Sequence, residues 1–190
     1  LIGLMHKAFE FSKTSFSFVI PAIVTETSGK DIQKLRQNCA CDVFFESTVA
    51  KQIALIEAGL QEPTIKVGNL SSTRTFQDAR DAVRAYYLLM LAAENNQIKN
   101  GDYFNIAGSE AFKLTEVVDI LINMSTVDNI KVDSVQERMR PIDADYQMFD
   151  NSKICKKINW SPEISARDMF RDLLNHWRDE IKNERVPLNR

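Results

Sequence analysis

Glycine is scarce and scattered in this chain, and its spacing excludes one common kind of site. Six glycines occur among 190 residues, and no two of them stand at G-x-G or G-x-x-G spacing. A turn that binds the pyrophosphate of a dinucleotide needs closely spaced glycines, because the backbone must approach the phosphates. The sequence therefore contains no dinucleotide-binding fingerprint.

Cysteine and histidine are also few. The cysteines are Cys39, Cys41 and Cys155, and the histidines are His6 and His176. An odd cysteine count with one Cys-x-Cys pair fits free thiols in a reducing compartment, so we expect a cytoplasmic protein. A structural zinc site needs four nitrogen or sulfur ligands at defined spacing, and we therefore expect no metal centre.

Long apolar runs and a strong net charge are missing as well. The longest apolar run, Phe16 to Val24, includes a serine and a proline, and it is far shorter than the ~20 residues that cross a bilayer. No secretory signal is visible at the start of the sequence. The net charge of −2 creates no general attraction for nucleic acid or anionic membranes. We expect neither as a partner, and an anionic ligand would need a local basic site.

The composition, with 44% apolar and 26% charged residues, is that of a globular protein. Helix patterns and caps predict helices over 44–59, 78–94, 114–124, 151–158 and from Ser165 onward. Strands are predicted at 64–68, 103–107 and 130–132, and a strand pair or one strand broken at Pro21 is predicted near 16–24. This alternation predicts an α/β or mixed α+β fold.

The helix predicted from Asp78 has the clearest start. Asp78 can accept from the first-turn amides, and Asp81 follows three residues later in an arrangement like a capping box. Apolar or aromatic side chains recur at helical spacing through Val83, Tyr86, Tyr87, Met90 and Leu91. The last predicted helix has a stripe that indicates core packing: Met169, Phe170, Leu173, Leu174, Trp177 and Ile181.

Two segments that contain arginine frame the middle of the chain. Arg74 is expected on an irregular segment between a strand and a capped helix, and Arg140 precedes Pro141, which favours extended backbone. The planar donor fork of arginine suits phosphate oxygens, so two converging arginines could clamp a diphosphate. A solvated surface arginine is the alternative for each of them.

These segments, with several others, resemble the C-terminal half of the extended short-chain dehydrogenases that act on nucleotide sugars. The matching motifs include Val49-Ala50-Lys51-Gln52-Ile53-Ala54, Val67-Gly68-Asn69-Leu70, Arg74-x-Phe76, Tyr103-Phe104-Asn105-Ile106-Ala107-Gly108, Arg140-Pro141-Ile142-Asp143 and Trp160-Ser161-Pro162-Glu163-Ile164. Their order and spacing are specific together, from about Asp42 to Trp177. The greatest similarity is to GDP-4-keto-6-deoxymannose reductases and GDP-mannose 4,6-dehydratases.

The resemblance implies a mixed α/β substrate domain with the last elements of a Rossmann domain, and without the N-terminal dinucleotide-binding half. We expect residues 1–41 to be a poorly matched remnant of the dinucleotide-binding domain. Residues 42–190 are expected to form the nucleotide-sugar substrate domain. The chain begins with Leu1 and not with methionine, which fits a part of a longer protein.

The resemblance also implies a substrate site. In the family, arginines at the positions of Arg74 and Arg140 contact the nucleotide diphosphate, and an acidic residue at the position of Asp143 faces the ribose. Lys51, on the first predicted helix, is a third candidate, and a solvated helix-face lysine is its alternative. The family often has aspartate where this chain has Thr75, which puts the local bracing of Arg74 in doubt.

The catalytic Tyr-x-x-x-Lys motif of the family is altered here. The nearest match is Phe9-Glu10-Phe11-Ser12-Lys13, in which Phe9 replaces the tyrosine. In the family, the tyrosine hydroxyl shuttles a proton and the lysine lowers its pKa and holds the cofactor ribose. Phenylalanine has no proton to give, so Lys13 is the catalytic candidate that is left, and a chance match is the alternative. The family uses NADP or NAD, and we expect no cofactor for this chain alone.

The expected function is reduction of a GDP-4-keto-6-deoxy sugar. Phe76 and Asp143 favour the reductases, since the dehydratases usually have tryptophan and glutamate there. Dehydration of GDP-mannose and a non-catalytic role in binding nucleotide sugars stay open, and so does whether this chain is itself an enzyme. The resemblance also implies a nucleotide-diphosphate sugar as ligand, and it allows a homodimer.

Overall fold

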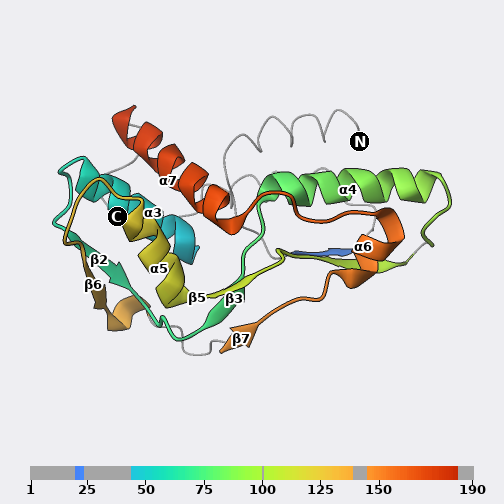
Figure 1. The fold of residues 1–190 in the computed structure, drawn as a ribbon, viewed down its shortest axis with the longest axis horizontal. Helices are drawn as coiled ribbons and strands as arrows, with labels where there is room; N and C mark the ends of the chain where they lie inside the picture. The colour runs from blue at the N-terminus through green and yellow to red at the C-terminus, as the bar shows by residue number, and fades with distance from the viewer. Residues whose placement is uncertain (1–19, 24–43, 100, 139–144, 184–190) are drawn as a thin grey trace. The chain divides into compact units, whose positions relative to one another are not determined.

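The computed structural model describes residues 20–23, 44–99, 101–138 and 145–183, which form helices and short strands in alternation (Figure 1). They divide into two compact units, each assembled from segments far apart in the sequence. The first unit contains β1 (Ile20–Ile23), Thr75–Ala111 and Met148–Ala166. The second contains residues 44–74, Phe112–Gln147 and the chain from Arg167 onward.

The first unit is built around β4 (Tyr103–Ile106), which pairs antiparallel with β1. Phe104 and Ile106 are buried on one face of β4. Helices α4 (Ala79–Glu94) and α6 (Ser152–Ile158) pack there, and Trp160 fills the space beside them. The buried cluster comprises Ala82, Ala85, Leu89, Ala92, Ile98, Phe104, Ile106, Ile154 and Trp160.

Strand β1 runs through Pro21 without a break, contrary to the broken strand that the proline suggested. In the part of the chain that the structure describes, β4 is the one neighbour of β1. A strand with a free edge tolerates a residue that lacks a backbone N–H. The preceding residues of the predicted strand region, 16–19, lie outside the described residues.

Helix α4 begins where its cap predicts, but it buries a different face from the large apolar stripe. Asp78 caps the helix by accepting from the Arg80 amide at 2.8 Å. The buried positions are Ala79, Asp81, Ala82, Ala85, Leu89 and Ala92. Tyr87, on the predicted stripe, is exposed. The buried face thus consists mainly of alanines and Leu89, while Tyr86 of the predicted set is partly buried against the same cluster.

The second unit combines a parallel strand pair with three helices. β2 (Thr64–Val67) pairs with β6 (Lys131–Ser134), and α3 (Phe45–Glu57), α5 (Leu114–Asn123) and α7 (Ala166–Lys182) supply most of the buried side chains. The buried apolar residues of this unit include Val49, Ile53, Ile56, Ile65, Val67, Leu114, Val117, Val118, Leu121, Met169, Phe170, Leu173, Leu174 and Trp177. The predicted core stripe of the last helix is thus confirmed, with Ile181 half-buried at its end.

A small three-stranded sheet has the order β5-β3-β7. Strand β3 (Thr73–Thr75) lies at its centre, between β5 (Ala111–Lys113) and β7 (Tyr146–Gln147). Arg74 is the middle residue of β3 and is paired in register with Gln147 of the parallel strand β7. Arg74 therefore stands on a strand with a neighbour on each side, and not on an irregular segment.

Candidate functional site

Arg74 is held by backbone on the strand that carries it. Its Nη1 donates to the carbonyl of Thr73 at 2.9 Å, and its side chain is half-buried. The amide of Thr73 donates to the carbonyl of Asp145 at 2.8 Å, just before β7. The Arg74 backbone is thus fixed by its neighbours, which meets one requirement for a side chain that binds a ligand in a defined geometry.

The connection from β2 to β3 packs closely against the 3-10 helix η1 (Gln136–Arg138). A Cβ atom added at Gly68 would fall on the carbonyl oxygen of Arg138 and lie 2.9 Å from its carbonyl carbon. The Ser134 hydroxyl donates to the carbonyl of Gly68 at 3.1 Å. The amide of Val135 donates to the carbonyl of Val67 at 2.8 Å. The chain that leads from β6 is therefore tied to the end of β2.

Three of the predicted site residues lie outside the described residues: Lys13, Arg140 and Asp143. The described residues on either side of 139–144 are Arg138, which packs on Gly68, and Asp145, which is bonded to Thr73. Arg138 and Asp145 thus contact the two ends of the stretch from Gly68 to Thr73. That Arg140 and Asp143 converge with Arg74 stays a prediction.

Lys51 lies on α3, with its ammonium group 5.3 Å from the centre of the Trp177 ring on α7. A cation at that distance from a tryptophan is attracted by the negative face of the ring. The Trp177 indole N–H in turn donates to the Ser47 hydroxyl at 3.1 Å. Lys51 therefore has a packing role between two helices of the second unit, beside the ligand role predicted for it.

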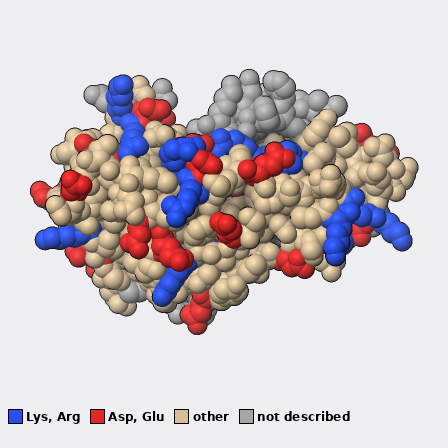
Figure 2. Space-filling model, viewed as in Figure 1, with Lys and Arg blue, Asp and Glu red and all other residues tan. Residues whose placement is uncertain are grey.

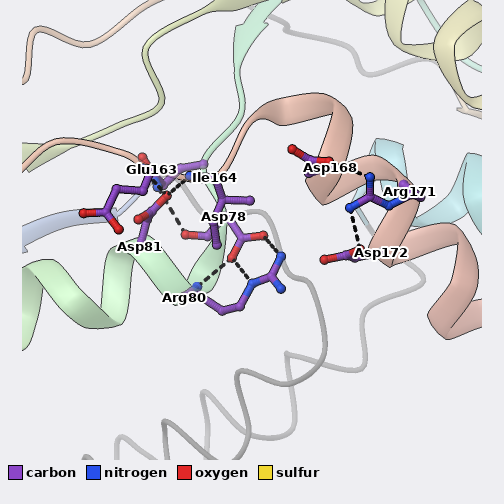
Figure 3. A network of polar contacts seen from close by, with 9 residues as sticks. Asp78, Arg80, Asp81, Glu163, Ile164, Asp168, Arg171 and Asp172 are labelled. Atoms are coloured by element: carbon purple, nitrogen blue, oxygen red, sulfur yellow. Dashed lines mark hydrogen bonds and ion pairs between the residues drawn. The ribbon is translucent and has the colours of Figure 1, made fainter.

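Asp81 makes more contacts than the sequence indicated. Its carboxylate accepts from the amides of Glu163 and Ile164, both at 2.9 Å (Figure 3). It also pairs with Arg84 at 2.9 Å. Its carbonyl accepts from the Trp160 indole N–H at 3.2 Å. The capping-box role predicted for Asp81 is therefore wrong, since its Oδ1 pairs with Arg84 and its Oδ2 accepts from amides about eighty residues further along the chain.

Three helix N-termini are already occupied by carboxylates. Asp78 accepts from the Arg80 amide at the start of α4, Glu116 from the Lys113 amide before α5, and Asp150 from the Ser152 amide of α6. Hydrogen bonds from Ser152 hold the pKa of Asp150 below its ordinary value. An ionised carboxylate at a helix start takes the amides that would otherwise attract a phosphate, and it repels that phosphate.

Two glycines that follow strands do not form a phosphate cradle either. Gly68 follows β2 and Gly108 follows β4, but the space beside each glycine is filled by backbone. A Cβ at Gly108 would fall on the carbonyl oxygen of Phe76, just as one at Gly68 would fall on that of Arg138. Neither of these two turns therefore forms a cradle for a pyrophosphate.

Among the described residues, no group of three His, Cys, Asp or Glu side chains is placed to hold a metal ion. None of the described helices is both long enough and apolar enough to span a bilayer. Basic and acidic side chains are interspersed on the face seen in Figure 2, which therefore has no extended basic field of the kind that binds nucleic acid.

Comparison with known proteins gives consistent matches. The family model described as GDP-mannose 4,6 dehydratase matches residues 34–173. The GDP-6-deoxy-D-mannose reductase of Pseudomonas aeruginosa is 25% identical over 143 residues, which cover 75% of this chain and 45% of that protein. The GDP-mannose 4,6-dehydratase of Yersinia enterocolitica is 23% identical over 155 residues, with 70% of this chain and 41% of that protein covered.

A solved structure extends the comparison to the fold. The structure of RMD from Pseudomonas aeruginosa complexed with NADPH matches with a TM-score of 0.65 and 23% identity, over 75% of this chain and 45% of that one. At this identity the match establishes the fold alone. The chain spans less than half the length of the relatives it matches.

Proposed function

Because the chain belongs to the GDP-mannose 4,6-dehydratase family, we propose that it binds a nucleotide-diphosphate sugar through its second unit. Arg74 and Arg140 would neutralise the diphosphate, and Asp143 would accept from the nucleotide ribose. The observation that carries the proposal is the position of Arg74: Thr73 beside it is bonded to Asp145, where the segment containing Arg140 and Asp143 ends. Lys51 is the third candidate cation.

Side-chain cations suit this site because the starts of α4, α5 and α6 are each occupied by a carboxylate. A diphosphate is commonly held by backbone amides at a helix N-terminus. In this chain the starts of α4, α5 and α6 are occupied by Asp78, Glu116 and Asp150. Arginine, with its bidentate fork, is the side chain best suited to replace those amides.

The reaction proposed for the longer enzyme is reduction of a GDP-4-keto-6-deoxy sugar with NADP or NAD as the cofactor. Dehydration of GDP-mannose is the second candidate, since relatives named for both activities are similar to this chain. Phe9 stands where the family has its proton donor, which leaves Lys13 as the catalytic candidate and favours binding alone for this chain. An assay of NADPH oxidation with the keto sugar distinguishes a reductase from a binding-only protein.

Replacing Arg74 with alanine tests the proposed site. We expect Arg74→Ala to weaken GDP binding by about 1.5–3 kcal/mol, or roughly ten- to a hundredfold, the range for hydrogen bonds to a charged group. Arg140→Ala is expected to act similarly, and Arg74→Lys should recover only part of the loss, because lysine cannot make two parallel hydrogen bonds. Isothermal titration calorimetry with GDP measures each effect.

Arg171→Ala is the control for the lost charge. Arg171 lies on α7 in the same unit and pairs with Asp168 and Asp172. Its replacement removes one exposed positive charge that is already paired with two carboxylates, so GDP affinity should stay within about twofold of the parent, as for a screened surface charge. Equal GDP affinity in the parent, Arg74→Ala and Arg140→Ala would refute the proposal that these two arginines bind the diphosphate.

Two broader points belong to the same proposal. The three cysteines and the nucleotide-sugar ligand support a cytoplasmic location. A homodimer is proposed from the family resemblance alone. Sedimentation equilibrium of the purified chain tests it, and a single monomeric species over the accessible concentrations would overturn it.

A further inference from the structure

Position 68 requires glycine because a side chain there would collide with Arg138, and not because the backbone conformation of Gly68 is restricted to glycine. The φ angle of Gly68 lies outside the left-handed region, so its backbone conformation is open to any residue. What excludes a side chain is the Arg138 carbonyl, whose carbon would lie 2.9 Å from an added Cβ. That neighbour is backbone and cannot rotate away, so η1 or the β2–β3 connection would have to move.

The opposite case occurs nine residues earlier in the chain. Gly59 has a φ of +70°, which favours glycine, but an added Cβ would meet nothing within 4 Å. A substitution at Gly59 strains the local backbone and displaces no neighbour. A side chain at Gly59 would therefore strain the local backbone without moving a neighbour, whereas a side chain at Gly68 would push the neighbouring backbone away. Both glycines lie in the second unit.

Displacement at Gly68 would be transmitted along a short path. Ser134 and Val135 bind the end of β2 through the carbonyls of Gly68 and Val67, and Arg138 in turn donates to the Val135 carbonyl at 3.1 Å. At the other end of this connection, Asp145 accepts from Thr73. The β2–β3 connection, which leads into Arg74, is thus tied at two points to the connection between β6 and β7.

We infer that Gly68 is a positioning residue for the nucleotide-diphosphate site: its missing side chain sets the spacing between the β2–β3 connection and η1. This inference rests on the proposed function, because the spacing matters for binding only if the ligand lies beside Arg74. Binding groups need placement within about 0.5 Å, so a shift forced by one methyl group is large enough to matter.

Gly68→Ala tests the inference, with GDP as the probe in titration calorimetry. We expect a loss of GDP affinity on the order of tenfold, at a temperature where near-UV circular dichroism shows the variant to be folded. Hydrogen exchange should accelerate at the Val135 and Arg138 amides, whose bonds lie on the displaced path. Gly59→Ala, the matched control, should bind GDP like the parent although its stability falls.

A second variant covers the case in which Gly68→Ala does not fold. Ser134→Ala removes the hydroxyl that binds the Gly68 carbonyl and adds no atoms. We expect a smaller loss of GDP affinity with the fold unchanged. Parent-like GDP binding by a folded Gly68→Ala, or by Ser134→Ala if the first variant does not fold, overturns the inference alone. No GDP binding by the parent overturns the proposed function, and this inference with it.

Discussion

Gln52 is a buried polar side chain that takes the place of a neighbouring strand. Its Oε1 accepts from the Lys66 amide at 2.8 Å, and its Nε2 donates to the Lys66 carbonyl at 3.0 Å. The carbonyls of Pro63 and Val67 accept from the β6 side, so the Lys66 groups point to the opposite edge of β2. Gln52 therefore satisfies backbone groups that would otherwise lack partners at that edge.

We expect Gln52→Leu to lower the free energy of unfolding by about 1–3 kcal/mol, because two backbone groups lose their partner while the side-chain volume is kept. Urea unfolding measures the loss. Hydrogen exchange at the Lys66 amide shows whether the effect arises at this edge.

Gln61→Leu is the matched control on the same edge. The Gln61 amide makes one hydrogen bond, to the Thr64 carbonyl at 2.9 Å, and is more exposed than Gln52. Its loss should cost about 0.5–1.5 kcal/mol, the net value of a single hydrogen bond. If Gln52→Leu costs no more than Gln61→Leu, Gln52 does not cover the strand edge in the way inferred.

The sequence indicated which residues could bind a ligand or cap a helix, but it did not indicate which residues they contact in the fold. Arg74 stood out because its chemistry suits phosphate, yet its place on a strand depends on pairing with β7, far along the sequence. Asp81 was predicted to cap its own helix, whereas it binds amides 82 and 83 residues away. Local patterns contain no information on such distant partners. That Asp81 is buried, and so needs partners, is visible only in the folded structure.

Helix ends, in contrast, depend on local chemistry and were predicted well. Asp78 fixes the start of α4, and the left-handed Gly59 follows the end of α3, as a glycine near a C-cap should. The buried face of α4 was harder to predict, because it consists mainly of alanines, with Leu89 as its one large apolar residue. Choosing between two possible faces of a helix requires knowledge of what packs against it.

Glu57, Arg178 and the end of α5 join three helices of the second unit. Arg178 on α7 donates to both Glu57 oxygens at 2.7 Å and to the Met124 carbonyl at 2.9 Å. The Thr126 amide donates to Glu57 at 2.8 Å. Burial alone would raise the pKa of Glu57, but the bonds from Arg178 and Thr126 outweigh it and hold that pKa below its ordinary value.

This lowered pKa predicts a loss of stability in acid. The carboxylate contributes fully above the ordinary glutamate pKa of about 4.3, and its contribution disappears as pH falls through the lower pKa of the folded state. We expect Glu57→Gln to cost about 1.5–3 kcal/mol at neutral pH, because a two-pronged pair with a 9% exposed carboxylate exceeds a surface ion pair. The difference from the parent should shrink below about pH 4. Urea unfolding across pH measures it.

An exposed pair on α7 provides the comparison. Asp168 and Arg171 lie 2.6 Å apart with 47% and 54% of their side chains exposed. Asp168→Asn should therefore leave the free energy of unfolding at neutral pH nearly unchanged, because solvent screens an exposed pair. A Glu57→Gln effect that is equally small, or that does not depend on pH, would show that the three-helix contact is not electrostatic.

At the scale of the molecule, the family resemblance and the mixed α/β fold predicted from the sequence are confirmed. The sequence did not reveal that each compact unit is assembled from separated segments. The motifs show only the order of segments along the chain. A compact unit is defined by which helices and strands pack together, and the order of motifs does not reveal this. The predicted division into residues 1–41 and 42–190 stays a prediction, since most of the first part lies outside the described residues.

The whole chain is predicted not to bind NADPH at micromolar concentration. A dinucleotide pyrophosphate needs free backbone amides, at a glycine-rich turn or a helix start. The six glycines lack the required spacing, and carboxylates occupy the starts of α4, α5 and α6. Gly68 and Gly108 approach backbone carbonyls, which repel phosphate as well. If arginines hold the diphosphate of GDP, GDP binding does not depend on these amides. The chain should therefore bind GDP but not NADPH.

Titrating one protein sample with NADPH by fluorescence and with GDP by calorimetry separates the two cases. We expect GDP to bind and NADPH to leave the signal unchanged up to concentrations of about 100 μM, above the usual micromolar range of nucleotide sites. GDP binding shows that the sample is folded, so a missing NADPH signal cannot be attributed to unfolding. A saturable NADPH signal, displaced by NADP but not by GDP, would mean that residues outside the described part form a dinucleotide site without the glycine spacing, and the prediction would be wrong.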